Sequence, residues 1–495
     1  MRPLVQEITT AKTPEGLVSA LLNPAPGLEA IPGVILLNSA GSGLYDRYSF
    51  VTAKPFLTFR SFGSRCEISS AGATRLQFGN PWHLLDALMA RCELLEEMDL
   101  PFPLGGCFGY WGYDLKNFVE PKLPRTAIND LEIPDSQVGF YGSLAVFDHH
   151  LAKTWVVSTG LSADGSRSEA RAKEALSFWE QQVAASEPVH TTEFRRSGRS
   201  NPPEITSTLS RDDFIARVHQ AQRHIRSGDI YQVNLSHRLA SIFAGSGWEF
   251  FQGLKEVSPA PFSAFLDCQD FQLASSSPEL FLRLSGSHIL TRPIKGTRPR
   301  SSDITRDAQL TYELQTSAKE MAELVMITDL LRNDLGRVCE FGSVQVPELV
   351  RLERYPQVQH LVSTVEGRLR SDVTHFSAFA SCFPGGSITG APKFRAMEII
   401  DELEPVSRGF YTGALGYLGF NRESQLSIAI RTAMFREGRG WFHAGAGIVA
   451  DSDPEAEYDE TIAKAQGFLQ ALRLQNQAAN TTSAQAEKSS RPESL

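Results

Sequence analysis

The segment that begins at Ser210 constrains the fold most, because its apolar pattern changes from helical to strand periodicity within a few residues. Ser210 suits a helix N-cap, with Asp213 three residues later. Apolar side chains follow on one helical face, namely Phe214, Val218, Ala221 and Ile225. Gly228 should end this helix, and residues 231–235 alternate as a strand. Strand and helix patterns continue to about Leu472, so the chain should mix α and β structure.

The N-terminal third also mixes α and β patterns, but its helix caps and turns are less distinct in the sequence. Residues 35–37 and 155–157 are apolar and β-branched enough to predict strands, and 82–95 has helical spacing. Charge and alanine dominate 162–179, which predicts a surface helix. The stretch 184–207 is rich in Ser, Thr, Pro and Arg, as linkers are.

These patterns divide the chain into four parts. We predict an N-terminal subdomain over 1–160, a surface helix and linker over 161–207, and a second domain over 208–474. Residues 475–495 are polar and small, and we expect a disordered tail there. The length of 495 residues also allows one large composite domain.

Composition excludes several classes of protein. The net charge of -9 argues against a nucleic-acid binder, which normally carries a basic surface. The six cysteines contain no CxxC pair, which indicates reduced thiols rather than a disulfide framework or a zinc site. Residues 1–7 lack an apolar signal core, and no stretch is long enough to cross a bilayer. We expect a cytoplasmic protein that binds neither membranes nor nucleic acids.

Lys295 stands in an unusual run, RPIKGTRPR over 292–300. The two prolines stiffen this run, and Gly296 allows a partner to approach closely. Neighbouring arginines disfavour the protonated amine, which is one way to make a lysine a nucleophile. The run is either a basic surface loop or part of a catalytic site.

Two predicted helices each present a pair of glutamates at i, i+3 spacing, so that both carboxylates share a face. Glu320 and Glu323 lie beside an apolar stripe. Glu457 and Glu460 follow an Asp-Pro helix start at 453–454. Four converging carboxylates would suit Mg²⁺. The alternative for the second pair is a surface ion pair with Lys464.

Three single residues have two interpretations each. Arg431 lies in a predicted apolar strand, 428–432, where a cation needs an anion from the protein or from a ligand. His360 lies on an apolar strand, where a satisfied core histidine is the default. Glu279 follows a serine run and is either a structural acid or a general acid.

Two glycine-rich segments are partly similar to known ligand-binding loops. Residues 385–393 are similar to a phosphate loop, but Ala391 stands where the Walker lysine belongs. Pro392 should begin a helix there, and exposed amides before it could hold a carboxylate. Residues 445–450 fit the loose dinucleotide pattern without the surrounding strand-helix-strand unit, so a nicotinamide site is not expected.

Taken in order, these motifs closely resemble the chorismate-utilising enzymes. The resemblance covers residues 213–472 through GDIYQVN, SSSPELF, PIKGTRPR, KEMAE, DLLRNDLGRV, VQHLVS, PGGSITGAPK, GFYTGALGY, IAIRTA and GAGIVADSDPEAEYDET. ILLNSA, DRYSFV and GGCFGYWGYDL match the N-terminal region of that family more loosely. The resemblance implies an α+β fold, a large composite domain of stacked antiparallel sheets flanked by helices as in anthranilate synthase large subunits.

Two positions separate the members of this family. PIKGT with Lys295 is similar to aminodeoxychorismate synthase large subunits, whereas anthranilate and isochorismate synthases usually have alanine there. Gln232 stands where isochorismate synthases place a water-activating lysine. The resemblance therefore implies amination of chorismate at C4 for p-aminobenzoate and folate synthesis. The alternatives are an anthranilate synthase large subunit and a non-catalytic subunit that binds chorismate or tryptophan.

The resemblance also implies roles for the residues singled out above. Lys295 would be the nucleophile, Glu279 the general acid, and His360 a contact of the reacting ring. Mg²⁺ would be held by Glu320, Glu323, Glu457 and Glu460. The substrate would be bound by Thr297, Ser387, Tyr411, Arg431, Gly445 and Gly447.

Two further expectations concern partners and regulation. The chain contains no glutaminase sequence, so ammonia should come from free ammonium or from a separate glutamine amidotransferase subunit. Relatives carry a tryptophan pocket, and the matching positions here are Leu37, Ser39, Pro261 and Phe262. Asn38 replaces the glutamate common in feedback-inhibited anthranilate synthases, so regulation by tryptophan is not expected.

Overall fold

Two large antiparallel sheets form the framework. The computed structural model describes residues 2–10, 12–24, 29–39, 47–94, 98–186, 204–355 and 357–489, with the backbone alone for 475–489. The first 12-stranded sheet has the order β1 (Leu4–Ile8), β10 (Lys153–Ser158), β9 (Ser143–Asp148), β3 (Tyr48–Thr52), β2 (Ile35–Asn38), β13 (Phe262–Asp267), β14 (Gln272–Ser277), β23 (Thr432–Arg436), β24 (Arg439–Ile448), β12 (Gln232–Ile242) and β11 (Ile205–Ser207). The short β20 (Gly390–Ala391) pairs with the start of β12.

The second 12-stranded sheet carries the other half of the strands. Its order is β17 (Ile294–Pro299), β19 (Val358–Arg368), β16 (His288–Arg292), β15 (Leu280–Ser285), β22 (Glu423–Ile428), β21 (Ala414–Gly419), β7 (Gly106–Trp111), β8 (Ser136–Tyr141), β4 (Leu57–Phe62), β5 (Arg65–Ser70) and β6 (Ala73–Phe78). β18 (Gln345–Arg354) pairs with β19.

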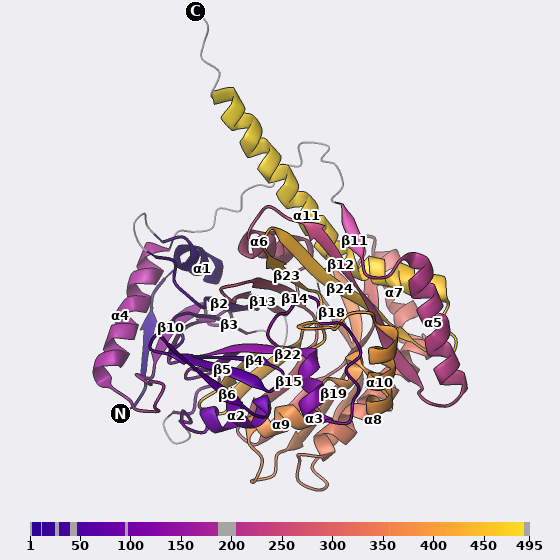
Figure 1. Cartoon of the computed structure of the whole chain (residues 1–495), viewed down its shortest axis with the longest axis horizontal. Helices are drawn as coiled ribbons and strands as arrows, with labels where there is room; N and C mark the ends of the chain where they lie inside the picture. The colour runs from indigo at the N-terminus through magenta and orange to yellow at the C-terminus, as the bar shows by residue number, and fades with distance from the viewer. Residues whose placement is uncertain are drawn as a thin grey trace, which may run out of the picture.

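Helices flank the two sheets (Figure 1). They are α1 (Pro14–Leu22), α2 (Pro81–Met89), α3 (Lys116–Val119), α4 (Glu169–Ala185), α5 (Arg211–Arg226), α6 (Gly247–Val257), α7 (Ile304–Gln315), α8 (Ala318–Gly336), α9 (His375–Cys382), α10 (Lys393–Leu403) and α11 (Pro454–Ser489), with 3₁₀ turns η1 (Tyr113–Leu115) and η2 (Gly386–Ile388). In Figure 1, α1 and α4 lie on the left of the molecule and α5, α8 and α10 on the right.

The sheets are stacked, and alternate residues of one strand face two different cores. Phe50 of β3 packs in the core that also contains Phe59 and Phe108 of the second sheet. Its neighbour Val51 faces the other core, which the first sheet shares with α1, α4, α6 and α11. This alternation follows from the two-residue period of a strand. The predicted α+β fold of stacked antiparallel sheets with flanking helices is confirmed.

Both sheets run across the predicted subdomain boundary. β2 pairs with β13 through Leu37 and Ala264, and β7 pairs with β21. The helix predicted over 162–179 is α4, which begins later, at Glu169, and ends later, at Ala185. Most of the predicted linker, 187–203, lies outside the described residues.

The local helix signals are accurate where capping and periodicity agree. Ser210 Oγ accepts the backbone N–H of Asp213 at 3.1 Å, and Phe214, Val218 and Ala221 are buried along α5. Gly228 adopts a φ of +82° after the helix ends. β12 then starts one residue later than predicted, at Gln232.

One prediction from the sequence is wrong. The helix predicted over 82–95 ends at Met89, because Cys92 and Leu94 stay buried in an irregular turn without helical geometry. The backbone of α11 is helical through Ser489. Residues 475–489 include four alanines and three glutamines, which favour helix even without an apolar face. The disordered tail expected over 475–495 stays a prediction. Residues 490–495 lie outside the described residues.

The cysteine thiols are unsuited to nucleophilic catalysis. All six cysteines are free and buried, and burial raises the pKa of the Cys107 thiol well above its usual value. Buried thiols of this kind are poor nucleophiles.

In the part of the chain that the structure describes, no helix is both long and apolar enough to cross a bilayer.

Candidate active site

Lys295 reaches from the edge of one sheet to the edge of the other. It lies on β17, where the pairing with β19 shifts register and Gly296 adopts a φ of +63°. Such a bulge re-aims the neighbouring side chain. Lys295 Nζ lies 4.0 Å from Glu323 Oε2, and the lysine side chain is 16% exposed. A Cβ built on Gly447 of β24 would lie 4.0 Å from the same Nζ. The lysine is therefore part of an internal cluster, and the surface-loop interpretation does not hold.

Glu279 supplies a carboxyl group beside this amine. It lies between β14 and β15 and is 7% exposed. Burial raises the pKa of Glu279 to about 7, although a hydrogen bond from Ser387 and the charge of Lys295 both act to lower it. A carboxyl group with this pKa is partly protonated near neutrality, as a general acid must be.

The two glutamate pairs come from helices on either side of Lys295. Glu320 and Glu323 lie in the first turns of α8, and Glu457 and Glu460 in the first turns of α11. Burial raises the pKa of Glu323, and the negative charges of Glu320 and Glu460 raise it further. The carboxylates of the two helices therefore converge closely enough to influence one another.

Each of these carboxylates also has a cationic neighbour. The pairs are Arg298–Glu320 at 3.4 Å, Lys295–Glu323 at 4.0 Å, Lys319–Glu457 at 3.9 Å and Lys464–Glu460 at 2.6 Å. The Lys464–Glu460 pair is the ion pair weighed as an alternative to metal binding. Among the described residues, no three His, Cys, Asp or Glu side chains lie close enough together to hold a metal ion in this arrangement.

The donor chemistry of this cluster nevertheless fits Mg²⁺. The ion prefers carboxylate oxygens, and one or two protein carboxylates with waters and substrate oxygens usually suffice. The lysines are flexible, so a bound cation could replace them beside the carboxylates. The magnesium site stays a prediction.

Arg431 lies at a break between two strands rather than within one. β22 ends at Ile428 and β23 begins at Thr432, and Arg431 has a φ of +52°, in the left-handed region. The prediction of a continuous apolar strand at this position is wrong. Burial lowers the pKa of the guanidinium, and no carboxylate of the described residues pairs with it. Glu460 is near enough to act against this lowering of the pKa, but it pairs with Lys464. Binding of a ligand anion by Arg431 stays a prediction.

The glycines of β24 direct their amides to an unpaired edge. The N–H groups of Asn234 and Ser236 donate outside the β12–β24 ladder, at 2.8 Å each. Gly447 and Gly445 are their partners across the ladder. In an antiparallel pair of this kind both residues point their polar groups outward. Because β23 pairs with β24 only as far as Phe442, the amides of both glycines face an edge without a strand partner.

Tyr411, His360 and Thr297 lie around the same cluster. A Cβ on Gly445 would lie 2.9 Å from the Tyr411 hydroxyl, which places the tyrosine beside β24. Thr297 Oγ1 lies 2.9 Å from His360 Nδ1. Burial and the charge of Arg431 lower the pKa of His360 to about 4, so the imidazole is neutral at neutral pH. The histidine is thus both a buried strand residue and a neighbour of the site.

Asn234 and Lys319 also belong to this cluster, although no sequence motif singles them out. Asn234 Nδ2 donates to the Ile388 carbonyl at 3.2 Å, and its Oδ1 would lie 2.6 Å from a Cβ on Gly445. Asn234 lies two residues after Gln232 on β12, so the two side chains share a face of the strand. That period could have identified it.

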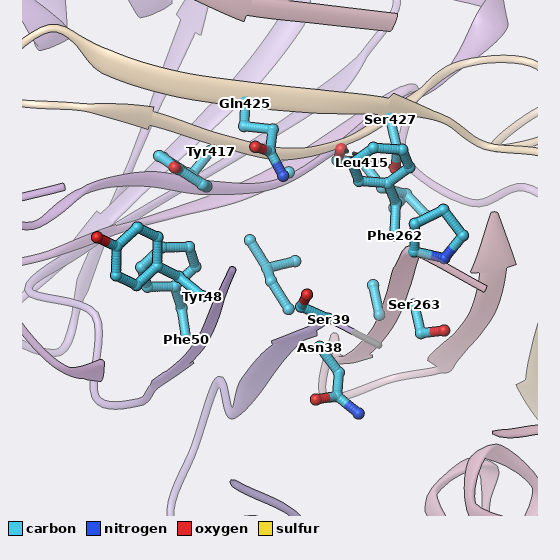
Figure 2. A pocket seen from close by; sticks show the side chains of 14 residues that line it. Asn38, Ser39, Tyr48, Phe50, Phe262, Ser263, Leu415, Tyr417, Gln425 and Ser427 are labelled. Carbon is cyan, nitrogen blue, oxygen red and sulfur yellow. Dashed lines mark hydrogen bonds between the residues drawn. The ribbon is translucent and has the colours of Figure 1, made fainter. Parts of the chain in front are cut away.

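A separate pocket lies between the two sheets at the predicted tryptophan positions (Figure 2). Leu37, Ser39, Pro261 and Phe262 all line it, and its cavity volume is about 30 Å³. Asn38 Nδ2 donates to Glu15 Oε1 at 2.9 Å, and its Oδ1 accepts from Ser49 Oγ at 2.9 Å. Glu15 pairs in turn with Lys255. The pocket therefore has no carboxylate free to bind an ammonium group at position 38.

The cluster around Lys295 combines carboxyl groups of raised pKa with a half-buried amine, as functional sites often do. Comparison with known proteins specifies the class. Residues 46–470 match the family model described as chorismate binding enzyme. The chain is 40% identical over 446 residues to the aminodeoxychorismate synthase component 1 of Salmonella typhimurium, covering 89% of this chain and 93% of that protein.

Anthranilate synthases match equally well. The chain is 40% identical over 450 residues to the anthranilate synthase component 1 of Thermus thermophilus, covering 90% of this chain and 93% of that protein. The crystal structure of anthranilate synthase component I from Streptococcus pneumoniae superposes with a TM-score of 0.75 at 29% identity, over 86% of this chain and 93% of that one. The chain belongs to the chorismate binding enzyme family.

Proposed function

We propose that this chain is the large subunit of an aminodeoxychorismate synthase, which converts chorismate and ammonia to 4-amino-4-deoxychorismate for p-aminobenzoate and folate synthesis. One observation carries the proposal. The Lys295 amine lies inside the cluster, 4.0 Å from Glu323 and close enough to Glu279 to lower the pKa of that carboxyl group. A buried lysine in this position can act as a nucleophile toward the substrate ring.

The reaction then follows in two displacements. In the first, Glu279 gives its proton to the C4 hydroxyl of chorismate, because a hydroxyl leaves readily only as water. Lys295 Nζ forms a bond to ring C2, the ring double bonds shift, and the C4–O bond breaks. In the second, ammonia bonds to C4, the double bonds shift back, and the C2–N bond to Lys295 breaks.

The remaining residues hold the substrate and its charges. Arg431 and the outward amides of Gly445 and Gly447 would bind the enolpyruvyl carboxylate, with Tyr411 beside them. Thr297 orients the neutral His360 toward the ring. Glu320, Glu323, Glu457 and Glu460 would hold Mg²⁺, which when bound would stabilise negative charge on the C1 carboxylate.

A glutamine amidotransferase is the proposed source of ammonia. The similar proteins from Salmonella typhimurium and Thermus thermophilus are both named component 1, which implies a second component. Free ammonium should replace that partner in the assay.

Anthranilate synthase is the second candidate, because relatives with that name match this chain at the same 40% identity. The purified chain should be incubated with chorismate, MgCl₂ and ammonium, and products separated by chromatography. The proposal predicts 4-amino-4-deoxychorismate and no fluorescent anthranilate. Anthranilate formed without a second enzyme would favour the rival, and binding of chorismate without any turnover would indicate a regulatory subunit.

A further inference from the structure

A second cavity lies under α4, among strand connections of the N-terminal part. It has a volume of about 230 Å³ and lies between α4 and the residues that follow β3, β8 and β10. None of the residues assigned to the proposed active site or to the pocket of Figure 2 lines it. In Figure 1, α4 lies on the left of the molecule, whereas α8, which carries two of the four glutamates, lies on the right.

One face of α4 supplies charged and aromatic groups to this cavity. Arg171, Glu174 and Phe178 line it at i, i+3 and i+7. These spacings place the three side chains on the same side of a helix. Beside the face that Ala172, Trp179 and Val183 bury in the core, α4 therefore presents a mixed apolar and charged face to an open space.

Lys54 is brought to the same space by an unfavourable backbone conformation. Its φ is +55°, and its Nζ lies 3.9 Å from the centre of the Phe178 ring. A non-glycine residue in the left-handed region is held there at a cost in free energy. The cation-π contact orients the ammonium group toward the cavity without neutralising its charge.

Within the described residues, the positive charges at this cavity form no salt bridge, although Arg171 is near enough to Asp164 to lower the pKa of that carboxyl group. Arg171 donates to the carbonyls of Gly160 and Ser166, at 3.1 Å each, and to Ser166 Oγ at 3.3 Å, all of which are neutral acceptors. No carboxylate of the described residues pairs with Arg171 or Lys54. Glu174 is the one acidic residue among those that line the cavity. Two cations beside apolar walls attract a carboxylate.

The wall of the cavity holds an unsatisfied hydroxyl group. Ser158 is fully buried, and within the described residues its Oγ has no hydrogen-bond partner. A buried hydroxyl without a partner costs free energy, which a ligand group could recover. Phe56 and Leu161 add apolar surface nearby.

We propose that this cavity binds a small carboxylate with a flat apolar body. Arg171 and Lys54 bind the carboxylate, Phe56 and Phe178 contact the apolar body, and Ser158 hydrogen-bonds a polar group on the ligand. Free aromatic acids and aromatic amino acids share this chemistry. Glu174 would distinguish them, because only an amino acid offers it an ammonium group.

The test is a calorimetric titration of the full chain with benzoate, 4-aminobenzoate and phenylalanine, and with neutral benzyl alcohol for comparison. We expect saturable binding of at least one of the three carboxylates, with a Kd on the order of 1 mM or tighter, and none of benzyl alcohol. Arg171→Gln should weaken that binding about tenfold or more, because it removes a charged hydrogen-bond donor. Ala175→Trp should abolish it by filling the cavity from the half-buried side of α4.

Two controls locate the binding. Arg211→Gln, on α5, changes an exposed arginine outside the cavity and should leave the Kd unchanged. Glu174→Gln should weaken binding only if the ligand is the amino acid. The proposal is overturned if no carboxylate binds at about 10 mM, or if binding survives both Arg171→Gln and Ala175→Trp. None of these measurements depends on turnover, so the result is independent of the proposed function.

Discussion

Replacing Glu279 with glutamine should lower activity and raise stability. Burial raises the pKa of the carboxyl group, which keeps the proton that catalysis needs but makes the ionised form unfavourable in the folded protein. Glu279 is 7% exposed, and burial raises its pKa from an ordinary value of 4.5 to about 7. The charged form is therefore less favourable in the folded protein than in the unfolded chain. Glutamine has almost the same shape and can accept the hydrogen bond from Ser387, but it has neither the charge nor the proton.

The magnitude follows from the two pKa values. Between pH 4.5 and about 7 the folded state binds more protons at Glu279 than the unfolded state does, so wild-type stability falls as the pH rises. Above that window the penalty is complete, at about 3 kcal/mol, since each pH unit between the two values contributes about 1.4 kcal/mol. Below pH 4.5 both states are protonated and the penalty disappears. Glu279→Gln should therefore gain up to about 3 kcal/mol at pH 8 and little near pH 4.5.

Urea unfolding at pH 5, 6, 7 and 8 measures this difference, and ammonium-dependent turnover of chorismate measures the loss of the acid. Turnover of Glu279→Gln should fall roughly 10²- to 10⁴-fold. Wild-type turnover should also decline as the pH rises above about 7, because the acid loses its proton. The control is Glu455→Gln, whose carboxylate is 74% exposed and should change neither property. Wild-type turnover in Glu279→Gln, or a stability difference that does not vary with pH, would refute the reasoning.

Three further predictions concern the substrate, the metal and the second pocket. Arg431→Gln should raise the KM for chorismate roughly 10- to 100-fold and change kcat much less in steady-state kinetics, and an unchanged KM would contradict its role as the carboxylate ligand. Chelation should abolish turnover and MgCl₂ restore it, and Glu323→Gln should raise the half-saturating Mg²⁺ concentration at least about tenfold, whereas an unchanged titration would exclude Glu323 as a ligand. Because the Asn38 amide is held by Glu15 and Ser49, tryptophan at about 1 mM should inhibit turnover less than twofold, and strong inhibition would contradict this.

The helices that the sequence predicted well are those with local signals. Ser210 caps α5 as expected, because an N-cap and an apolar stripe depend only on neighbours in the chain. The end of α2 was predicted wrongly, because the helical spacing of apolar residues continues past Met89, where the helical backbone ends.

Convergence of the site could not be predicted from spacing. The i, i+3 pattern identified each glutamate pair, but their approach to Lys295 requires β17 of one sheet to meet β24 of the other. The positive φ of Arg431 is likewise a tertiary effect, since its flanking residues favour a continuous strand. The resemblance to a family supplied these long-range relations, and physical pattern alone supplied the candidate residues.

The most direct test of the account is the mass of the intact protein after brief exposure to chorismate and MgCl₂ without ammonium. The account predicts a fraction of wild-type chains heavier by one chorismate less one water, with the added group on the peptide that contains Lys295. Lys295→Ala should show no such species, and added ammonium should remove it from the wild type. An adduct that persists in Lys295→Ala, or amination by a wild-type protein that never carries the adduct, would contradict the covalent role of this lysine.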